Sequence, residues 1–165
     1  MSNKPSLGTS QLDGQGVVVG VVQAKFNSHI TDALWAACCN ELLNCGVDNK
    51  DIIHVCVPGA LELPVVLQRM AQTPEFDVLI AIGAVIKGDT YHFDLVCAES
   101  TRGISQIALD YEIPIINLVL TTYTENQALE RTDRKGTEAA RSALEMANLM
   151  KSLDSLLFDG EDYDS

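Results

Sequence analysis

Residues 83–93, GAVIKGDTYHF, combine glycines, a cation and an imidazole in a pattern suited to binding an anion and transferring a proton. Gly83 and Gly88 are separated by four residues, as at the start of a phosphate-binding loop, but no Lys-Ser/Thr pair follows the second glycine. The sequence therefore argues against nucleoside triphosphate hydrolysis. A helix that begins here would still present backbone N–H groups to an anion beside Lys87. The alternative is a plain strand-to-helix turn, with Gly88 for flexibility and Thr90 as the N-cap.

Three other side chains have both a structural and a functional interpretation. His92 falls in the first turn of the helix expected after this loop, where the helix dipole favours the neutral imidazole that exchanges protons near neutral pH. A lone histidine is otherwise more often structural. Phe26 could be a core residue, or it could stack on a planar ligand. Glu62 would stabilise a helix start through the dipole, or it would accept hydrogen bonds from the N–H groups of a ligand.

The acidic charge balance of the chain argues against two classes of binding partner, nucleic acids and anionic membranes. The sequence has 11 Lys+Arg against 23 Asp+Glu, a net charge of −12. Proteins that bind nucleic acids or anionic membranes depend on basic surface, so neither partner is expected. One small basic cluster is either a solvated charge run or a phosphate-binding site; it consists of Arg131, Arg134 and Lys135.

Four short apolar, β-branched runs are typical of strands buried on both faces of a parallel sheet. They are Val17–Val22, Ile52–Val57, Val78–Val85 and Ile115–Leu120. Segments with helical periodicity lie between and after them: Ile30–Leu43, Leu61–Ala71, His92–Leu109 and Gly136–Leu153. This alternation predicts an α/β fold, a four-stranded parallel sheet with helices on both faces. Ligands of such sheets bind at the carboxyl ends of the strands, here the loops Gln23–Asn27, Pro58–Glu62, Ala84–His92 and Thr121–Asn126.

The length of 165 residues predicts a single domain, expected over 16–157 between a flexible N-terminal segment, 1–15, and a disordered acidic tail, 158–165. No stretch approaches the roughly 20 apolar residues that span a bilayer, and the N-terminus lacks the apolar core of a secretory signal. The five cysteines form no Cys-x-x-Cys pair, and the three histidines have no partner at zinc-ligand spacing. We therefore expect a cytoplasmic protein with reduced thiols and no metal site.

Several motifs, taken in order, resemble the 6,7-dimethyl-8-ribityllumazine synthase family. They are Phe26-Asn27 after the first strand, PGALELP at 58–64, GAVIKGDTYHF at 83–93, VLTT at 119–122, QALER at 127–131, and Lys135-Gly136. Each motif alone is weak, but their order along residues 16–153 is highly specific. The resemblance implies a flavodoxin-like fold, a three-layer α/β/α sandwich.

The resemblance also implies a reaction. Members of this family are transferases that condense 5-amino-6-(D-ribitylamino)uracil with 3,4-dihydroxy-2-butanone 4-phosphate to form 6,7-dimethyl-8-ribityllumazine. Phosphate and water are released in this penultimate step of riboflavin biosynthesis. The family uses no metal and no organic cofactor, so the expected ligands of this chain are its two small-molecule substrates.

Carried across residue by residue, the resemblance implies a role for each site position. His92 is the implied proton donor. The implied contacts of the ribitylaminouracil are Phe26, Ala60, Leu61, Glu62, Ala84, Val85, Ile86 and Asn117. The implied contacts of the butanone phosphate are Asp89, Thr90, Arg131 and Lys135.

Some of these positions depart from the family pattern. Lys87 stands where arginine is more common, which keeps the charge but loses the bidentate fork. Asp89 replaces a small residue, so its contact with phosphate must come from the backbone. Asn117 stands where phenylalanine is often found, which leaves only a polar contact with the uracil. The segment before Gly136 is shorter than in many members, which leaves the role of Lys135 open.

The family forms homo-oligomers, which the resemblance extends to this chain. It implies pentamers, in some members twelve of them in a 60-subunit icosahedral shell, and riboflavin synthase as a further partner. Each active site lies between neighbouring subunits, with Phe26, Glu62 and His92 from one chain and Asn117 and Arg131 from the next.

Two other functions remain open on this fold. One is a non-catalytic flavin- or lumazine-binding protein with a storage or shell role, and the other is a riboflavin synthase that joins two lumazines. Neither needs a phosphate site, because the lumazine has already lost its phosphate. His92, Arg131 and Lys135 together therefore favour the condensing enzyme.

Overall fold

Four parallel strands form the sheet of the computed structural model, which describes Leu7 and residues 12–158. The strands lie in the order β2-β1-β3-β4, and every neighbouring pair is parallel. Their bounds are β1 Val19–Ala24, β2 Ile52–Val57, β3 Val78–Ile86 and β4 Ile115–Thr122. The expected flexible segment 1–15 and acidic tail 158–165 lie largely outside the described residues.

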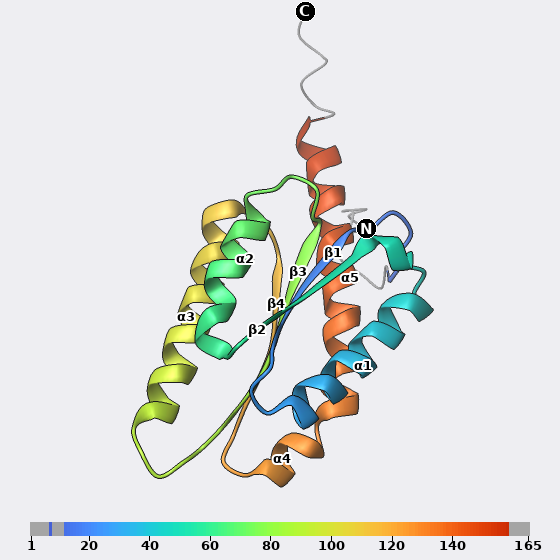
Figure 1. The fold of residues 1–165 in the computed structure, drawn as a ribbon. Helices are drawn as coiled ribbons and strands as arrows, with labels where there is room; N and C mark the ends of the chain where they lie inside the picture. Colours follow the sequence, from blue (N-terminus) through green and yellow to red (C-terminus); the bar gives the residue numbers. More distant parts are fainter. Residues whose placement is uncertain (1–6, 8–11, 159–165) are drawn as a thin grey trace, which may run out of the picture.

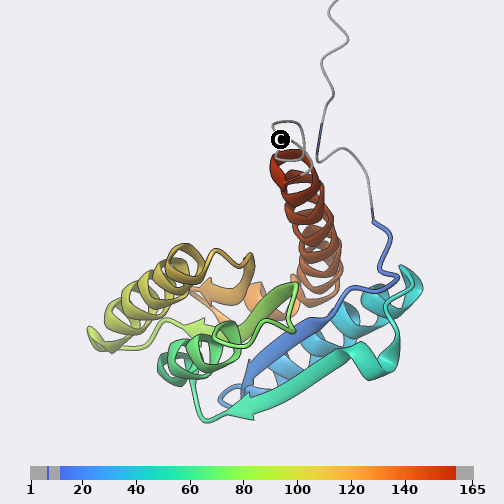
Figure 2. The ribbon, with the colours of Figure 1, turned by 90° about the horizontal axis from the view of Figure 1, so that it is seen from above.

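Helices connect the strands and cover both faces of the sheet (Figures 1 and 2). One face is covered by α1 and α5 and the other by α2 and α3, while the short α4 lies at the carboxyl edge on the side of α1 and α5. This confirms the predicted flavodoxin-like α/β/α sandwich. The bounds are α1 Ser28–Asn44, α2 Leu63–Ala71, α3 His92–Tyr111, α4 Glu125–Leu129 and α5 Thr132–Phe158, with short 3-10 helices η1 Asn49–Asp51 and η2 Ala60–Glu62.

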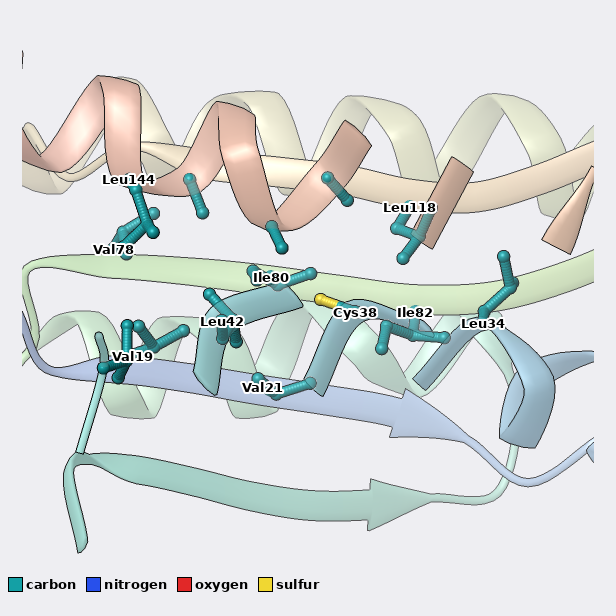
Figure 3. Packing of buried hydrophobic residues seen from close by; sticks show 14 of the residues in the cluster. Val19, Val21, Leu34, Cys38, Leu42, Val78, Ile80, Ile82, Leu118 and Leu144 are labelled. Carbon is teal, nitrogen blue, oxygen red and sulfur yellow. The ribbon is translucent and has the colours of Figure 1, made fainter. Parts of the chain in front are cut away.

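Alternate side chains of the central strands supply the two halves of the core. Val19 and Val21 of β1 pack beneath α1 and α5 (Figure 3), whereas Val22 and Ala24 pack beneath α2 and α3. Every residue of β1 is buried, which explains why this strand is a continuous apolar run and not an alternating one. The Cys38 thiol of α1 lies in the first half of the core, where burial raises its pKa to about 12 and keeps it protonated.

Most predicted elements differ from the structure by one to five residues at one or both ends, and two differences have a clear physical cause. β1 continues past its predicted end because the polar Gln23 is only 2% exposed and is hydrogen-bonded inside the fold. α4 was not predicted, because five residues are too few to form an apolar stripe, although Thr124 and Gln127 form a capping box at its start. α5 begins before and ends after the predicted 136–153. None of the helices in the described ranges is long and apolar enough to cross a membrane.

The helices α1 and α5 approach each other closely at Gly136. A Cβ atom at this position would lie 2.7 Å from the Leu34 carbonyl oxygen and 2.7 Å from the Ala37 Cβ. Backbone atoms of a packed helix cannot rotate away as a flexible side chain can. Gly136 is therefore required by the contact between the two helices that cover this face of the sheet.

We expect Gly136→Ala to destabilise the fold. Alanine gains about 1 kcal/mol of helix propensity, but overpacking against backbone costs about 1–3 kcal/mol, so the net effect is a loss. The midpoint of thermal unfolding measures it, with Thr137→Ala on the same helix as the control. A Gly136→Ala protein as stable as wild type would show that α1 and α5 separate without cost.

Candidate active site

A cavity of about 550 Å³ lies at the carboxyl edge of the sheet, on the face covered by α2 and α3. The ends of β1, β2 and β3 and the first turns of α3 enclose it. The wall is mostly apolar and carries a few polar groups. Both its size and its lining are typical of a small-molecule site.

Nine of the thirteen site residues expected from the sequence line this cavity. They come from four separate segments of the chain: Phe26, Ala60, Leu61, Glu62, Ala84, Val85, Ile86, Thr90 and His92. The four that do not line it are Asp89, Asn117, Arg131 and Lys135. The fold therefore brings most of the expected site together within one chain and leaves the rest outside the cavity.

Six further residues line the cavity without having been assigned a role from the sequence, although four of them lie in the loops where a ligand was expected. The six are Ala24, Pro58, Gly59, Gly88, Phe93 and Val96. Most of them stand next to expected residues in the same loops. Val96 lies one helical turn after His92, and this spacing places both on one face of α3. The i, i+4 spacing in the sequence is the signal that could have identified it.

The loop after β1 is fixed by backbone hydrogen bonds to the end of β2. The Lys25 amide donates to the Val57 carbonyl at 2.8 Å, and the Phe26 amide donates to the Pro58 carbonyl at 3.1 Å. The Phe26 side chain is 71% exposed, which excludes its interpretation as a core residue. An exposed ring on a fixed loop beside an apolar cavity is well placed to stack on a planar ligand.

Gln23, three residues before Phe26, connects this part of β1 to α1 and β2. Its Nε2 donates to the Thr31 hydroxyl at 3.2 Å and to the Asp32 carboxylate at 2.7 Å, and its Oε1 lies 2.8 Å from the His54 Nε2. The His54 ring stacks on Trp35, with centroids 4.3 Å apart. Burial lowers the pKa of His54, and the nearby Asp32 charge opposes this effect.

Glu62 ends the 3-10 helix η2, directly before α2. Its side chain is exposed, borders the cavity and makes no capping hydrogen bond with α2. Its carboxylate oxygens are therefore available to accept hydrogen bonds from N–H groups of a ligand. Leu61 beside it is 46% exposed and adds apolar surface to the same wall.

The start of α3 brings backbone amides and an imidazole to the cavity. The helix begins at His92 after Tyr91, and no side chain caps it. Thr90 is therefore not the N-cap, and the interpretation of a plain capped turn is wrong at this residue. Because Thr90 and His92 both line the cavity, the positive end of the α3 dipole lies at its wall.

Lys87 contacts the aromatic ring of Tyr123. Its Nζ lies 5.3 Å from the centroid of the Tyr123 ring, a distance typical of a cation–π contact. The Tyr123 ring in turn lies 6.4 Å from the Phe93 ring, which lines the cavity. Lys87 itself does not line the cavity, although its neighbours Ile86 and Gly88 do.

The basic residues after β4 lie on the side of α1 and α5. Arg131 follows α4, whose Ala128 is buried in the core half beneath these two helices. The Arg131 Nη1 donates to the Gln127 carbonyl at 2.7 Å. Lys135 lies on α5 and forms an ion pair with Glu138 at 3.5 Å. Neither side chain reaches the cavity of its own chain.

Asn117 and Asp89 also lie outside the cavity wall. Asn117 is on the edge strand β4, where its side-chain oxygen accepts a hydrogen bond from the Val119 amide at 2.9 Å. Asp89 is exposed and lies between the lining residues Gly88 and Thr90. Its backbone is therefore close to the cavity wall.

The arrangement combines a stacking ring, an acceptor carboxylate, a helix start with amide donors, and an imidazole. Such a set can hold a planar ligand and an anion side by side and can transfer a proton between them. In the described part of the chain, no three His, Cys, Asp or Glu side chains are grouped so that they could hold a metal ion.

The fold and the cavity define a flavodoxin-like α/β protein with a small-molecule site at the carboxyl edge of its sheet. The model of the family described as 6,7-dimethyl-8-ribityllumazine synthase matches residues 16–151. A protein of that name from Acidovorax sp. (strain JS42) is 54% identical over 143 residues, 87% of this chain and 93% of the relative. Proteins of the same name from Cupriavidus metallidurans and Burkholderia mallei (strain SAVP1) are 52% identical, covering 89% and 91% of this chain and 87% of each relative. The chain belongs to the 6,7-dimethyl-8-ribityllumazine synthase family.

The partly buried position of His54 predicts a pH dependence of stability. Its pKa in the folded chain is lowered from about 6.5 in the unfolded chain. The folded protein thus binds fewer protons than the unfolded chain in mild acid. The contribution of neutral His54 to the free energy of unfolding is therefore lost as the pH falls below about 6.5. Glutamine can still donate to Gln23 but does not titrate. We expect the thermal midpoint to fall less from about pH 7.5 to about pH 5.5 in His54→Gln than in wild type; equal falls would contradict this.

Proposed function

We propose that the cavity at the carboxyl edge is where this chain condenses 5-amino-6-(D-ribitylamino)uracil with 3,4-dihydroxy-2-butanone 4-phosphate. The product is 6,7-dimethyl-8-ribityllumazine, formed with release of phosphate and water in the penultimate step of riboflavin biosynthesis. The observation that carries the proposal is that nine residues implied by the family resemblance line one cavity. Membership of the family supplies the class of enzyme, a transferase.

The ribitylaminouracil is proposed to bind against three parts of the wall. Phe26 stacks on the pyrimidine ring, whose large flat face suits an exposed aromatic side chain. The backbone of residues 84–86 bonds the edge of the ring, and residues 60–62 contact the uracil and the ribityl chain. Glu62 supplies the acceptor for N–H groups of this substrate.

The butanone phosphate is proposed to bind at the start of α3. The backbone of Asp89 and Thr90 contacts the phosphate, and Arg131, with Lys135, neutralises it. Joining an amine to a ketone, eliminating phosphate and closing a ring require proton transfers more than a strong nucleophile. His92 supplies the proton, a role that contributes roughly 10²–10⁴-fold. Holding the two substrates together adds to this, and the reaction needs neither a metal nor an organic cofactor.

The position of Arg131 supports an active site shared between subunits. Arg131 follows α4 on the side of α1 and α5, whereas the cavity lies on the side of α2 and α3. We propose that Asn117 and Arg131 complete the cavity of a neighbouring subunit. Head-to-tail contacts of this kind close a ring, here a pentamer, and twelve pentamers would form the 60-subunit shell known in some family members.

Residues 16–157 form one catalytic domain that acts in the cytoplasm, and riboflavin synthase is the partner that takes up its product. Incubation of the chain with both substrates, followed by lumazine fluorescence, tests the function. Formation of lumazine is the expected result. A storage protein or a riboflavin synthase would produce no lumazine from these substrates.

His92→Ala should reduce turnover by roughly tenfold or more, while the KM of each substrate changes little, as expected when a proton donor is removed. Asp94→Asn, an exposed position on the same turn of α3 that does not line the cavity, is the control and should retain wild-type turnover. Turnover that is unchanged in His92→Ala would exclude this residue as the proton donor.

Subunits that carry His92→Ala and subunits that carry Arg131→Ala should complement each other. Each variant alone is expected to be strongly impaired. When the two are unfolded together and refolded at equal amounts, roughly a quarter of the interfaces pair an intact His92 with an intact Arg131. We expect activity to recover to about that fraction of wild type. Mixed oligomers without recovery would show that both residues serve the site of one chain.

A further inference from the structure

Asn27 links the loop that carries Phe26 to β3. Its Nδ2 donates a hydrogen bond to the Ala84 carbonyl at 2.8 Å. The same residue is the N-cap of α1, with left-handed backbone angles of φ 59° and ψ 48°. Its carbonyl accepts the amides of Ile30 and Thr31 at 2.9 and 3.1 Å. One residue therefore turns the chain into α1 and bonds the turn to the cavity wall.

The Ala84 carbonyl needs a partner because β3 is longer than β1. Pairing between the two strands ends at Gln23 and Ile82, whereas β3 continues to Ile86. The Lys87 amide donates to the Thr122 carbonyl of β4. Because the backbone groups of successive residues in a strand point to opposite sides, odd-numbered residues of β3 bond toward β4, and even-numbered residues such as Ala84 bond toward β1. Beside Ala84, the chain that follows β1 has already turned away from β3. The Asn27 side chain occupies the place of the missing strand.

Few residue types combine these two properties. A left-handed backbone is easily adopted by glycine and, among other residues, mainly by asparagine and aspartate. Glycine has no side chain to bond Ala84, and an aspartate carboxylate cannot donate to a carbonyl oxygen. Asparagine alone of the three supplies the donor.

We propose that Asn27 is a positioning residue for the ribitylaminouracil, an inference that rests on the proposed function. Phe26, the adjacent residue, provides the ring that stacks on the uracil, and Ala84 begins the backbone that bonds the uracil edge. The Asn27–Ala84 hydrogen bond fixes the spacing between these two walls. Its loss leaves the butanone phosphate site at the start of α3 unchanged.

The test compares Asn27→Asp and Asn27→Gly with wild type in steady-state lumazine formation. Both variants retain a residue suited to the left-handed backbone, and both remove the donor to Ala84. We expect each to raise the KM of the ribitylaminouracil about tenfold, because binding of this substrate must then order a loop that the hydrogen bond no longer fixes. The KM of the butanone phosphate should stay within about twofold of wild type.

Gly46→Ala serves as the control for a loss of stability. Gly46 follows the opposite end of α1 with φ 99°, and an added Cβ would meet only the Gln15 amide at 3.9 Å, so alanine adds backbone strain far from the cavity. It should lower the thermal midpoint and leave both KM values unchanged. A raised ribitylaminouracil KM in Gly46→Ala would show that a loss of folding stability is enough to raise this KM, and it would overturn the inference.

Three other results are decisive. A wild-type KM for the ribitylaminouracil in Asn27→Asp or Asn27→Gly would overturn the positioning role. Equal rises in both substrate KM values would assign Asn27 a general structural role instead. A wild-type chain that forms no lumazine would overturn the proposed function and with it this inference. If the wild type is active, the KM values of the Asn27 variants test the positioning role alone.

Discussion

The pairing of β1 with β3 stops before β3 ends, and the geometry of the carboxyl edge depends on this difference in length. Beyond the last pair, Gln23 and Ile82, β1 turns away and carries Phe26 to the rim, while the next residues of β3 become cavity wall. Buried backbone groups must be paired, and bonds to Val57, Pro58 and the Asn27 side chain meet this need where the ladder ends. The same unequal pairing thus produces the opening, its aromatic rim and its hydrogen-bonding wall.

The two layers of helices separate the residues to which the proposed reaction assigns a role. Phe26, Glu62 and His92 lie at the cavity on the side of α2 and α3, whereas Arg131 follows α4 on the side of α1 and α5. Ala128 of α4 is buried beneath α1 and α5, which keeps that segment on its own side of the sheet, and the exposed His29 and Glu125 side chains pair nearby. The proposed site between two subunits would remove the need for the chain to fold back around its own sheet.

The sequence predicted the fold best where a continuous apolar run is buried, as in the central strands β1 and β3. The predicted bounds of β2, Ile52–Val57, match the strand, but the prediction of burial on both faces is wrong for β2 and β4, which lie at the edges of the sheet and are only partly buried. The sequence misplaced the end of β1 because Gln23 is polar by type, and only its partners from other elements show that it is buried. α4 was missed because a five-residue helix shows no periodicity. Motifs located Phe26, Glu62 and His92 at the cavity. The bond from Asn27 to Ala84 depends on where two strands cease to pair, which spacing along one chain does not encode.

The stack of Trp35 on His54 gives the chain an internal optical reporter. The sequence contains one tryptophan, so all indole emission originates beside the Gln23 hydrogen bonds, at the base of the segment that leads to Phe26. The two rings are almost parallel, at 5°, and an imidazole in this position affects the excited indole according to its protonation. Fluorescence titration of the unmodified protein would therefore follow His54 directly, and the same signal would register any movement between α1 and β2.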